Sequence, residues 1–262
     1  MTIAQTMLAS GRSRAWAVLM LLALASLLQG CAAKPELVRP ATLSAPYDAS
    51  RGEVLWAVVP LRNESGTTLA DTLAISDKVV AAASQVRGVR TLPLNRTIAT
   101  MRALRMTHLE TPADAKKLAT EMGADGIIVG SITAYDPFDP PTLGIALALY
   151  SRTPIMDFAG AQTMDTRTLQ AQPTDYQYFP RSSFGEAPAS VISQYMDAKN
   201  HQLLADVRAY ASGRHDPRSA YGWRRYVASM DLFTEFAAWH AVSRLLDSEW
   251  LRLAKATQQQ PK

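Results

Sequence analysis

The sequence predicts an α/β fold in which a mixed β-sheet is flanked by helices and followed by a C-terminal helical extension. Between residues 53 and 152, short apolar runs typical of buried strands alternate with stretches of helical periodicity. Beyond residue 199 the pattern is helical only, and residues 221–254 contain no proline and one glycine, Gly222. The chain of 262 residues is long enough to bury a sizeable core.

The first strand is the apolar run over residues 54–61, which is typical of a strand buried on both faces. The elements expected after it are a helix over 69–85, a strand over 89–92, helices over 93–106 and 111–122, strands over 126–134, 142–151 and 191–196, and a helix over 201–212. Residues 153–189 hold several prolines without clear periodicity, so we expect an irregular segment there.

Local signals predict where these helices begin and end. Thr67 or Thr68 is the expected N-cap of the first helix, because threonine oxygens accept hydrogen bonds from free N–H groups. Thr111 followed by Pro112 opens the third helix, since proline suits the first helical position, and Gly123 is a suitable C-terminal cap.

The last helical stretch is amphipathic and carries one apolar stripe. Its apolar residues recur every three or four positions: Leu232, Phe236, Trp239, Val242, Leu246, Trp250 and Leu253. Such a stripe either packs on its own domain or forms a docking face for a partner protein or a second copy. In the second case Phe236, Trp239 and Trp250 are the docking residues, and both interpretations stay open from sequence.

The N-terminus has the layout of a secretory signal peptide. Arg12 and Arg14 precede an uncharged run over residues 15–28, which as a helix spans roughly 21 Å, short of the ~30 Å hydrocarbon core. The run ends in Leu28-Gln29-Gly30-Cys31, which resembles the bacterial lipobox. This resemblance implies cleavage between Gly30 and Cys31 and acylation of Cys31 by diacylglycerol and a fatty acid such as palmitate. An uncleaved anchor and an ordinary cleaved signal are the alternatives.

Cys31 is the only cysteine, and lipidation would consume a thiol that could otherwise pair between chains in an oxidising compartment. Ala32 follows it, whereas an Asp there favours retention in the inner membrane in lipoproteins of this type. The resemblance therefore implies an outer-membrane protein that faces the periplasm. The expected organisation is a signal peptide over 1–30, a proline-containing lipidated tether over 31–52, an α/β domain over 53–198 and a C-terminal helical segment over 199–262.

The charge balance does not favour a nucleic-acid partner. Removing residues 1–30 leaves 25 basic and 23 acidic residues, a net charge of +2. No basic run is longer than Arg224-Arg225, and no aromatic residues interleave with a basic stripe.

The sequence offers no readable catalytic chemistry. Phosphate-binding, nucleophile-elbow and zinc-protease motifs are absent from it. None of the four histidines (His108, His201, His215 and His240) has a second histidine or cysteine at ligand spacing. Asp136 and Asp139 lie among rigid prolines, unlike a calcium loop, and are expected to cap a strand connection. Asp231 and Glu235 are expected on a solvated helix face, where their like charges repel slightly unless a neighbour such as Arg224 or Arg225 compensates. We therefore expect no metal, no cofactor and no enzyme.

Residues 53–152 resemble the periplasmic α/β domain of the curli-secretion-channel, TolB amino-terminal and penicillin-binding-protein-activator lipoproteins. Three stretches carry the resemblance: Ala57–Asn63 for an "AVxPFxN" strand, Leu94-Asn95-Arg96 for a "VxDR"-type element, and Leu118–Gly130 for "AxxxGADxxVxG". Leu61 replaces the usual Phe, and Asn95 replaces the Asp. The resemblance implies a binding, activating or pore-forming envelope protein.

The function expected from these observations is a non-enzymatic binding or assembly component of the cell envelope. Its membrane contact is the N-terminal lipid, and an envelope protein or a second copy is the expected partner. A subunit of a secretion-channel-like oligomer is the first alternative, and an envelope enzyme of unknown type is the second.

Overall fold

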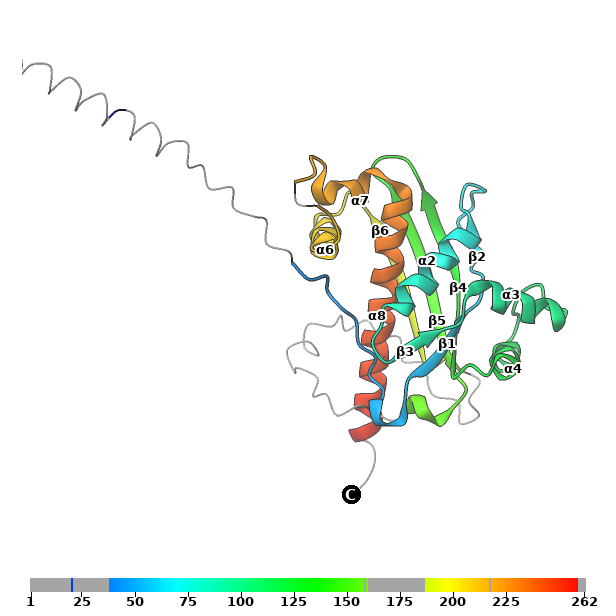
Figure 1. The fold of residues 1–262 in the computed structure, drawn as a ribbon. Coiled ribbons are helices and arrows are strands. Elements are labelled where there is room, and N and C mark those ends of the chain that lie inside the picture. Colours follow the sequence, from blue (N-terminus) through cyan, green and yellow to red (C-terminus); the bar gives the residue numbers. More distant parts are fainter. Residues whose placement is uncertain (1–19, 21–37, 158, 160–186, 217, 259–262) are drawn as a thin grey trace, which may run out of the picture. The chain divides into compact units, whose positions relative to one another are not determined.

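A computed structural model describes residues 20, 38–157, 159, 187–216 and 218–258. Residues 38–262 form one compact unit. The predicted fold class is confirmed, because the described residues of this unit form a six-stranded mixed sheet with helices on both faces and a helical C-terminal region (Figure 1).

The sheet is parallel on one side and antiparallel on the other. The order of the strands is β3 (Val89–Thr91), β1 (Val54–Val58), β4 (Gly126–Asp136), β5 (Thr142–Ser151) and β6 (Ser190–Asp197), with β2 (Arg62–Asn63) pairing with β4. β1 runs parallel to β3 and β4, whereas β4, β5 and β6 are antiparallel neighbours. Every strand except β2, which has two residues, overlaps a predicted strand, and the largest difference is at β1, which ends at Val58 instead of residue 61.

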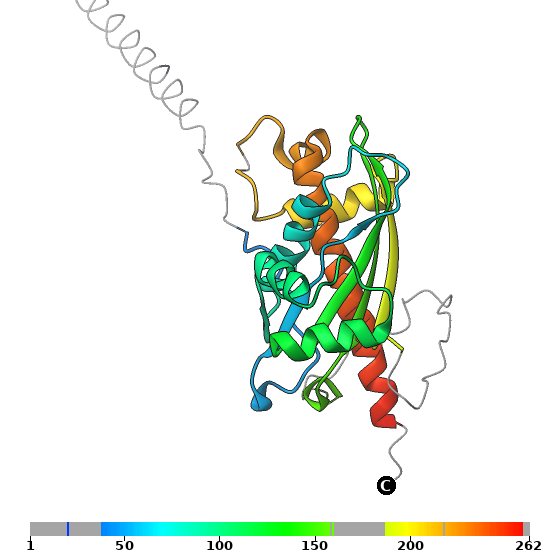
Figure 2. The same cartoon turned by 90° about the vertical axis from the view of Figure 1, so that its right-hand side faces the viewer.

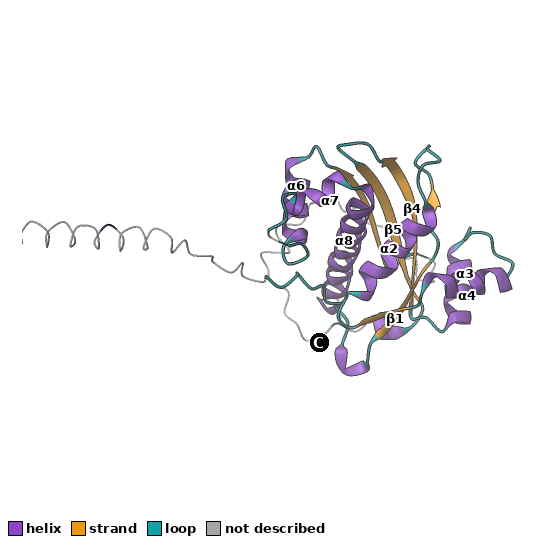
Figure 3. Ribbon diagram, turned by 45° about the horizontal axis from the view of Figure 1, so that its top comes forward, coloured by secondary structure: helices purple, strands orange, loops and turns teal. Residues whose placement is uncertain are grey.

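The larger core lies on the sheet face covered by α2 (Thr72–Ser84) and α8 (Met230–Gln258), and α6 (His201–Ala211) contributes buried residues to it. Figure 3 shows α2 and α8 side by side over this face. Alternate residues of β5, from Leu143 to Leu149, point into this core and are almost completely buried. β5 is therefore an internal strand whose apolar residues are satisfied by the helices of the same chain.

A second, smaller core lies on the opposite face, under α3 (Leu94–Ala103) and α4 (Pro112–Met122). Figure 2 looks onto the side of the molecule that carries these two helices. Ala57 and Ile127 from the sheet pack against Leu118 of α4. The continuous apolar run of β1 follows from this arrangement, since the strand is buried on both faces.

Capping signals were predicted correctly for α4 and incorrectly for α2. Thr111 and Asp114 form a reciprocal capping box at the start of α4, and Gly123 ends the helix with φ = 66°. At α2 the N-cap is Asp71, whose carboxylate accepts from the N–H groups of Leu73 and Ala74, and not Thr67 or Thr68. Thr67 instead accepts from the Leu69 N–H group, in the loop before the helix.

The last helix is shorter at its start than its sequence pattern suggests. Residues Gly222–Arg224 form a 3₁₀ turn (η3), and α7 (Arg225–Ala228) follows it. Ser229 then adopts an extended conformation, with φ = −124° and ψ = 119°, so α8 begins at Met230. None of the helices in the described parts of the chain has both the length and the apolar character to cross a membrane.

The tether predicted over residues 31–52 is contradicted from Val38 onward, where the compact unit begins. Residues 43–51 pack on the α/β unit: the N–H of Ala45 donates to the carbonyl of Arg87, the N–H of Arg87 donates to the carbonyl of Leu43, and Tyr47 is buried. A 3₁₀ turn (η1, Ala49–Arg51) capped by Asp48 completes this segment. Only residues N-terminal to Val38 lie outside the compact unit.

The docking face proposed for the last helix is also contradicted for Phe236. α8 packs against α2, α7, β5 and β6, so Phe236 is completely buried in the larger core. Trp239 is half-buried, with its ring 5.1 Å from that of Tyr210. Trp250 is half-buried as well. The stripe therefore packs on its own domain, and residues 199–258 share a core with the sheet instead of forming a separate segment.

Replacement of Phe236 by alanine should destabilise the unit by roughly 3–5 kcal/mol, because it leaves a cavity in a completely buried site. Urea denaturation followed by circular dichroism measures the change. The matched control is Phe138→Ala, where the side chain is 72% exposed and the expected change is within about 0.5 kcal/mol. If the two variants were equally stable, Phe236 would not be a core residue, and its interpretation as a surface docking residue would stand.

Candidate functional site

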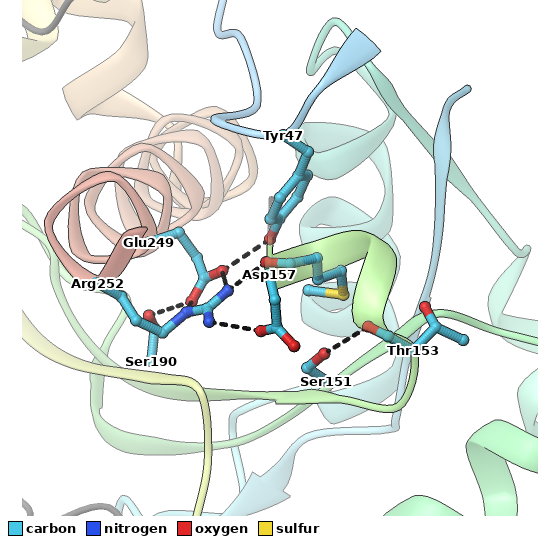
Figure 4. Close-up of polar contacts among 8 residues, drawn as sticks. Tyr47, Ser151, Thr153, Asp157, Ser190, Glu249 and Arg252 are labelled. Atoms are coloured by element: carbon cyan, nitrogen blue, oxygen red, sulfur yellow. Dashed lines mark hydrogen bonds and ion pairs between the residues drawn. The ribbon is translucent and has the colours of Figure 1, made fainter. Parts of the chain in front are cut away.

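Among the described residues, the most extensive buried polar cluster centres on Glu249, in the C-terminal half of α8 (Figure 4). Its carboxylate is completely buried. One oxygen, Oε2, accepts from the hydroxyl of Tyr47 at 3.0 Å, and the other, Oε1, accepts from the hydroxyl of Ser190. Each oxygen also accepts from the Arg252 guanidinium, at 2.9 Å from Nε and 2.8 Å from Nη2.

Arg252 extends this cluster to the 3₁₀ turn η2 (Pro154–Asp157). Its Nη1 donates to Asp157 at 2.9 Å, and its Nη2 donates to the carbonyl of Met156 at 2.5 Å. The guanidinium thus makes a bidentate ion pair with Glu249 and a second ion pair with a carboxylate that is mostly exposed.

Four segments that are distant in sequence bring these groups together. Tyr47 comes from the segment before β1, Asp157 from η2, Ser190 from the first residue of β6, and Glu249 and Arg252 from one face of α8. Within α8 the spacing of three residues places the carboxylate and the guanidinium on the same face. Tyr47 and Glu249 are 202 residues apart in sequence.

The electrostatics of the cluster favour a neutral phenol and a charged guanidinium. Burial raises the pKa of Tyr47 well above its ordinary value, and the negative charge of Glu249 raises it further. Burial alone would lower the pKa of Arg252, but its hydrogen bonds and ion pair with Glu249 raise that pKa above the ordinary value.

This arrangement is suited to holding segments together and not to acid–base catalysis. A general base needs an acceptor position that a substrate can reach. Both oxygens of Glu249 already accept two hydrogen bonds each, and the side chain has no exposed surface. Chemically, the cluster is a clamp that joins the N-terminal segment, η2 and β6 to α8.

The predicted lipidation and cleavage residues, Cys31 and Gly30, lie outside the described residues, so their roles stay predictions. Among the described residues, no group of three or more His, Cys, Asp or Glu side chains is placed to hold a metal ion. Asp136 accepts from the N–H of Phe138 at 3.1 Å, which is the turn-capping role expected for it. Asp139 precedes a cis peptide bond to Pro140 in the same connection.

Contacts are described for three of the four histidines, and these contacts suit a structural role. His108 pairs with exposed Glu110 at 3.1 Å, and His215 contacts the carbonyl of Ala211 at 2.6 Å. His240 lies at the edge of the core, with its ring 5.6 Å from that of Phe236. Burial lowers the pKa of His240, and the charge of nearby Arg244 lowers it further.

The solvated face expected for Asp231 and Glu235 is observed for Asp231 and not for Glu235. Asp231 is exposed and pairs with Lys78 of α2 at 3.0 Å, and not with Arg224 or Arg225. Glu235 is half-buried and accepts from the hydroxyl of Tyr210 at 3.2 Å. Both contacts cross between elements, which explains why spacing along one helix did not reveal them.

Sequence reasoning missed every member of the clamp. One local signal was present: Glu249 lies between Leu246 and Trp250 on the apolar stripe, where a charged residue requires a buried partner. Arg252 was identifiable as that partner from its spacing, whereas Tyr47 and Ser190 were not.

The described surface also has an open hollow of about 330 Å³ lined by Ser219, Tyr221, Arg225, Ala228, Ser229 and Leu232.

Replacement of Glu249 by glutamine should destabilise the unit by roughly 3–5 kcal/mol, because Arg252 would keep a largely buried charge without its bidentate partner. Chemical denaturation at pH 7 measures this change. Glu64→Gln is the control, since Glu64 is exposed and its ion pair with Arg62 spans 3.8 Å. A Glu249→Gln variant as stable as the control would show that the clamp contributes nothing.

The contribution of Tyr47 should depend on pH in a defined direction. Its folded pKa lies above the unfolded value of about 10, so the folded state keeps the proton longer and stability falls as pH rises beyond about 10. Below pH 9, Tyr47→Phe should cost about 1–3 kcal/mol. Above pH 10 this difference should shrink by up to about 1.4 kcal/mol per pH unit. Denaturation of both proteins from pH 8 to 11 tests this, and a constant difference would contradict it.

No protein-family description matches the sequence, and no curated protein matches it either. Solved structures show partial likeness. Lipoprotein GNA1162 from Neisseria meningitidis is 17% identical over 60% of this chain and 94% of its own, with a TM-score of 0.38. The PelC dodecamer from Paraburkholderia phytofirmans is 12% identical over 81% of this chain and 94% of its own, with a TM-score of 0.32. The LpoB C-terminal domain from Salmonella enterica is 12% identical over 42% of this chain and 75% of its own, also with a TM-score of 0.32. At these low values the likeness concerns part of the backbone and assigns no function to this chain.

Proposed function

We propose that this chain is a lipid-anchored protein of the bacterial cell envelope that acts in the periplasm as a non-enzymatic binding or assembly component. One observation carries the proposal: the sole cysteine, Cys31, ends a short apolar run in the sequence Leu28-Gln29-Gly30-Cys31. A thiol at this position becomes the acylated first residue when the signal peptide is removed. Two or three acyl chains on one residue hold a protein at a bilayer stably, because each buried CH₂ contributes about 0.8 kcal/mol.

The position of the compact unit supports an anchoring role for Cys31. The unit begins at Val38, seven residues after the cysteine. The clamp then joins the segment around Tyr47 to the far C-terminal helix through buried hydrogen bonds. The segment around Tyr47 is therefore held in the larger of the two described cores and is not a loosely attached leader.

A non-enzymatic role is supported by the chemistry of the described residues. Their largest buried polar cluster has its acceptors occupied, and the hollow near Leu232 is open and lacks an acidic or histidine side chain in its lining. The secretion-channel alternative requires strands that can leave the core. β4 and β5 are the longest strand pair, and Leu143 to Leu149 of β5 pack under α8, so this pair does not favour that alternative.

Replacement of Cys31 by serine should abolish incorporation of radiolabelled palmitate and leave an unprocessed precursor. The measurement is autoradiography together with the apparent mass of the protein in membrane fractions. Ala33→Ser is the matched control, because it adds the same hydroxyl two residues away and leaves the cysteine intact. Mature-sized Cys31→Ser protein would contradict lipid anchoring.

The variant Ala32→Asp should move the labelled protein from the outer to the inner membrane.

A further inference from the structure

We propose that an arginine-rich corner of the compact unit binds the anionic phospholipid headgroups of the membrane that holds Cys31. This inference rests on the proposed lipid anchor. The corner is formed by the end of α6, the loop after it, η3 and the first residues of the unit. Its residues, called the basic corner below, are Arg39, Arg208, Arg214, Arg218, Arg224 and Arg225.

The chain enters the compact unit at this corner. A Cβ atom added to Gly213, which has φ = 78°, would lie 2.3 Å from the carbonyl oxygen of Val38 and 2.8 Å from the nitrogen of Pro40. The entering segment therefore runs directly against the loop after α6, as Figures 1 and 2 also show. Arg214 holds it there, because its Nη2 donates to the carbonyl of Ala41 at 3.2 Å.

Chain length then limits how far this corner can lie from the bilayer. Cys31 and Val38 are seven residues apart, and a fully extended chain of that length spans at most roughly 25 Å. For comparison, α8 contains 29 residues and is about 44 Å long. An acylated Cys31 consequently keeps the basic corner near the membrane surface, whereas the opposite end of the unit can lie well away from it.

The positive charge of the unit is concentrated at this corner. Residues 38–262 contain 24 basic and 22 acidic residues, a net charge of +2. Residues 208–225 contain five arginines and one acid, Asp216, a net charge of +4, so the rest of the unit carries −2. Arg208, Arg218, Arg224 and Arg225 are exposed. Among the described residues, no carboxylate lies within 4.0 Å of any of these four guanidinium groups.

Aromatic side chains accompany these arginines in a way that suits a membrane interface. The guanidinium carbons of Arg208 and Arg224 lie 5.0 and 5.3 Å from the ring centre of Trp223. Tyr221 is 67% exposed beside them in the sequence. Tryptophan and tyrosine favour the headgroup region of bilayers, and arginine binds phosphate through paired N–H groups. The chemistry therefore fits a phospholipid surface that carries net negative charge.

The compact unit alone, residues 38–262, tests this proposal, because it contains both described cores and excludes Cys31. Its binding is measured by co-sedimentation with vesicles of phosphatidylcholine alone and of phosphatidylcholine with phosphatidylglycerol. We expect binding to the anionic vesicles only, and we expect it to weaken as salt is raised. Each basic residue near an anionic surface contributes about fivefold in partitioning, so Arg218→Gln/Arg224→Gln/Arg225→Gln should lower binding roughly 100-fold.

The matched control is the variant Arg62→Gln/Arg96→Gln/Arg102→Gln, which removes three exposed charges on β2 and α3 and should change binding less than about threefold. Circular dichroism checks that both variants are folded. Equal losses in the two variants, equal binding to neutral vesicles, or no binding to anionic vesicles would each overturn the proposal. Because the unit lacks Cys31, these outcomes are independent of lipidation. Failed palmitate labelling would refute the anchor and leave the measured headgroup affinity intact.

Discussion

The buried ion pair between Glu249 and Arg252 is the interaction on which the packing of the segment before β1 against β6 and α8 depends. A buried carboxylate is tolerated only when its hydrogen-bonding positions are satisfied, and here four donors occupy them. Because these donors come from the segment before β1, from β6 and from α8, the three segments cannot separate without exposing an unpaired buried charge. The ion pair therefore confers specificity on a contact between parts of the chain that have no covalent crosslink.

The clamp and the basic corner both contain residues of the segment before β1. The clamp joins this segment to α8, and the basic corner joins it to the loop after α6. The chain enters the unit beside Gly213 and Arg214, then continues to Tyr47, where the clamp joins it to α8. The N-terminal segment is thus held at Ala41, at Leu43 and Ala45, and at Tyr47 before the first strand begins. The segment before the first strand is therefore part of the folded unit and not a separate leader.

The long amphipathic helix illustrates how a correct local prediction can support a wrong functional interpretation. The three- and four-residue steps from Leu232 to Leu253 correctly predict a helix with one apolar face. The same steps cannot show what covers that face. In the folded chain α2, β5 and β6 cover it, with α7 beside them, so Phe236 and Trp239 are core or core-edge residues. An apolar face that is covered by the same chain has the same sequence pattern as one that is covered by a partner protein.

The sequence by itself determined what depends on neighbouring residues: the alternation of strands and helices, the capping box at Thr111, the glycine end at Gly123 and the lipobox-like signal before Cys31. These features arise within about four positions along the chain, where residue identity and backbone preference are sufficient. Tertiary structure alone decided the contacts of Tyr47 with Glu249, of Lys78 with Asp231 and of Gly213 with the entering chain. The physical reason is that such contacts depend on which faces of the sheet the helices cover, and a single sequence does not contain that packing in its local pattern.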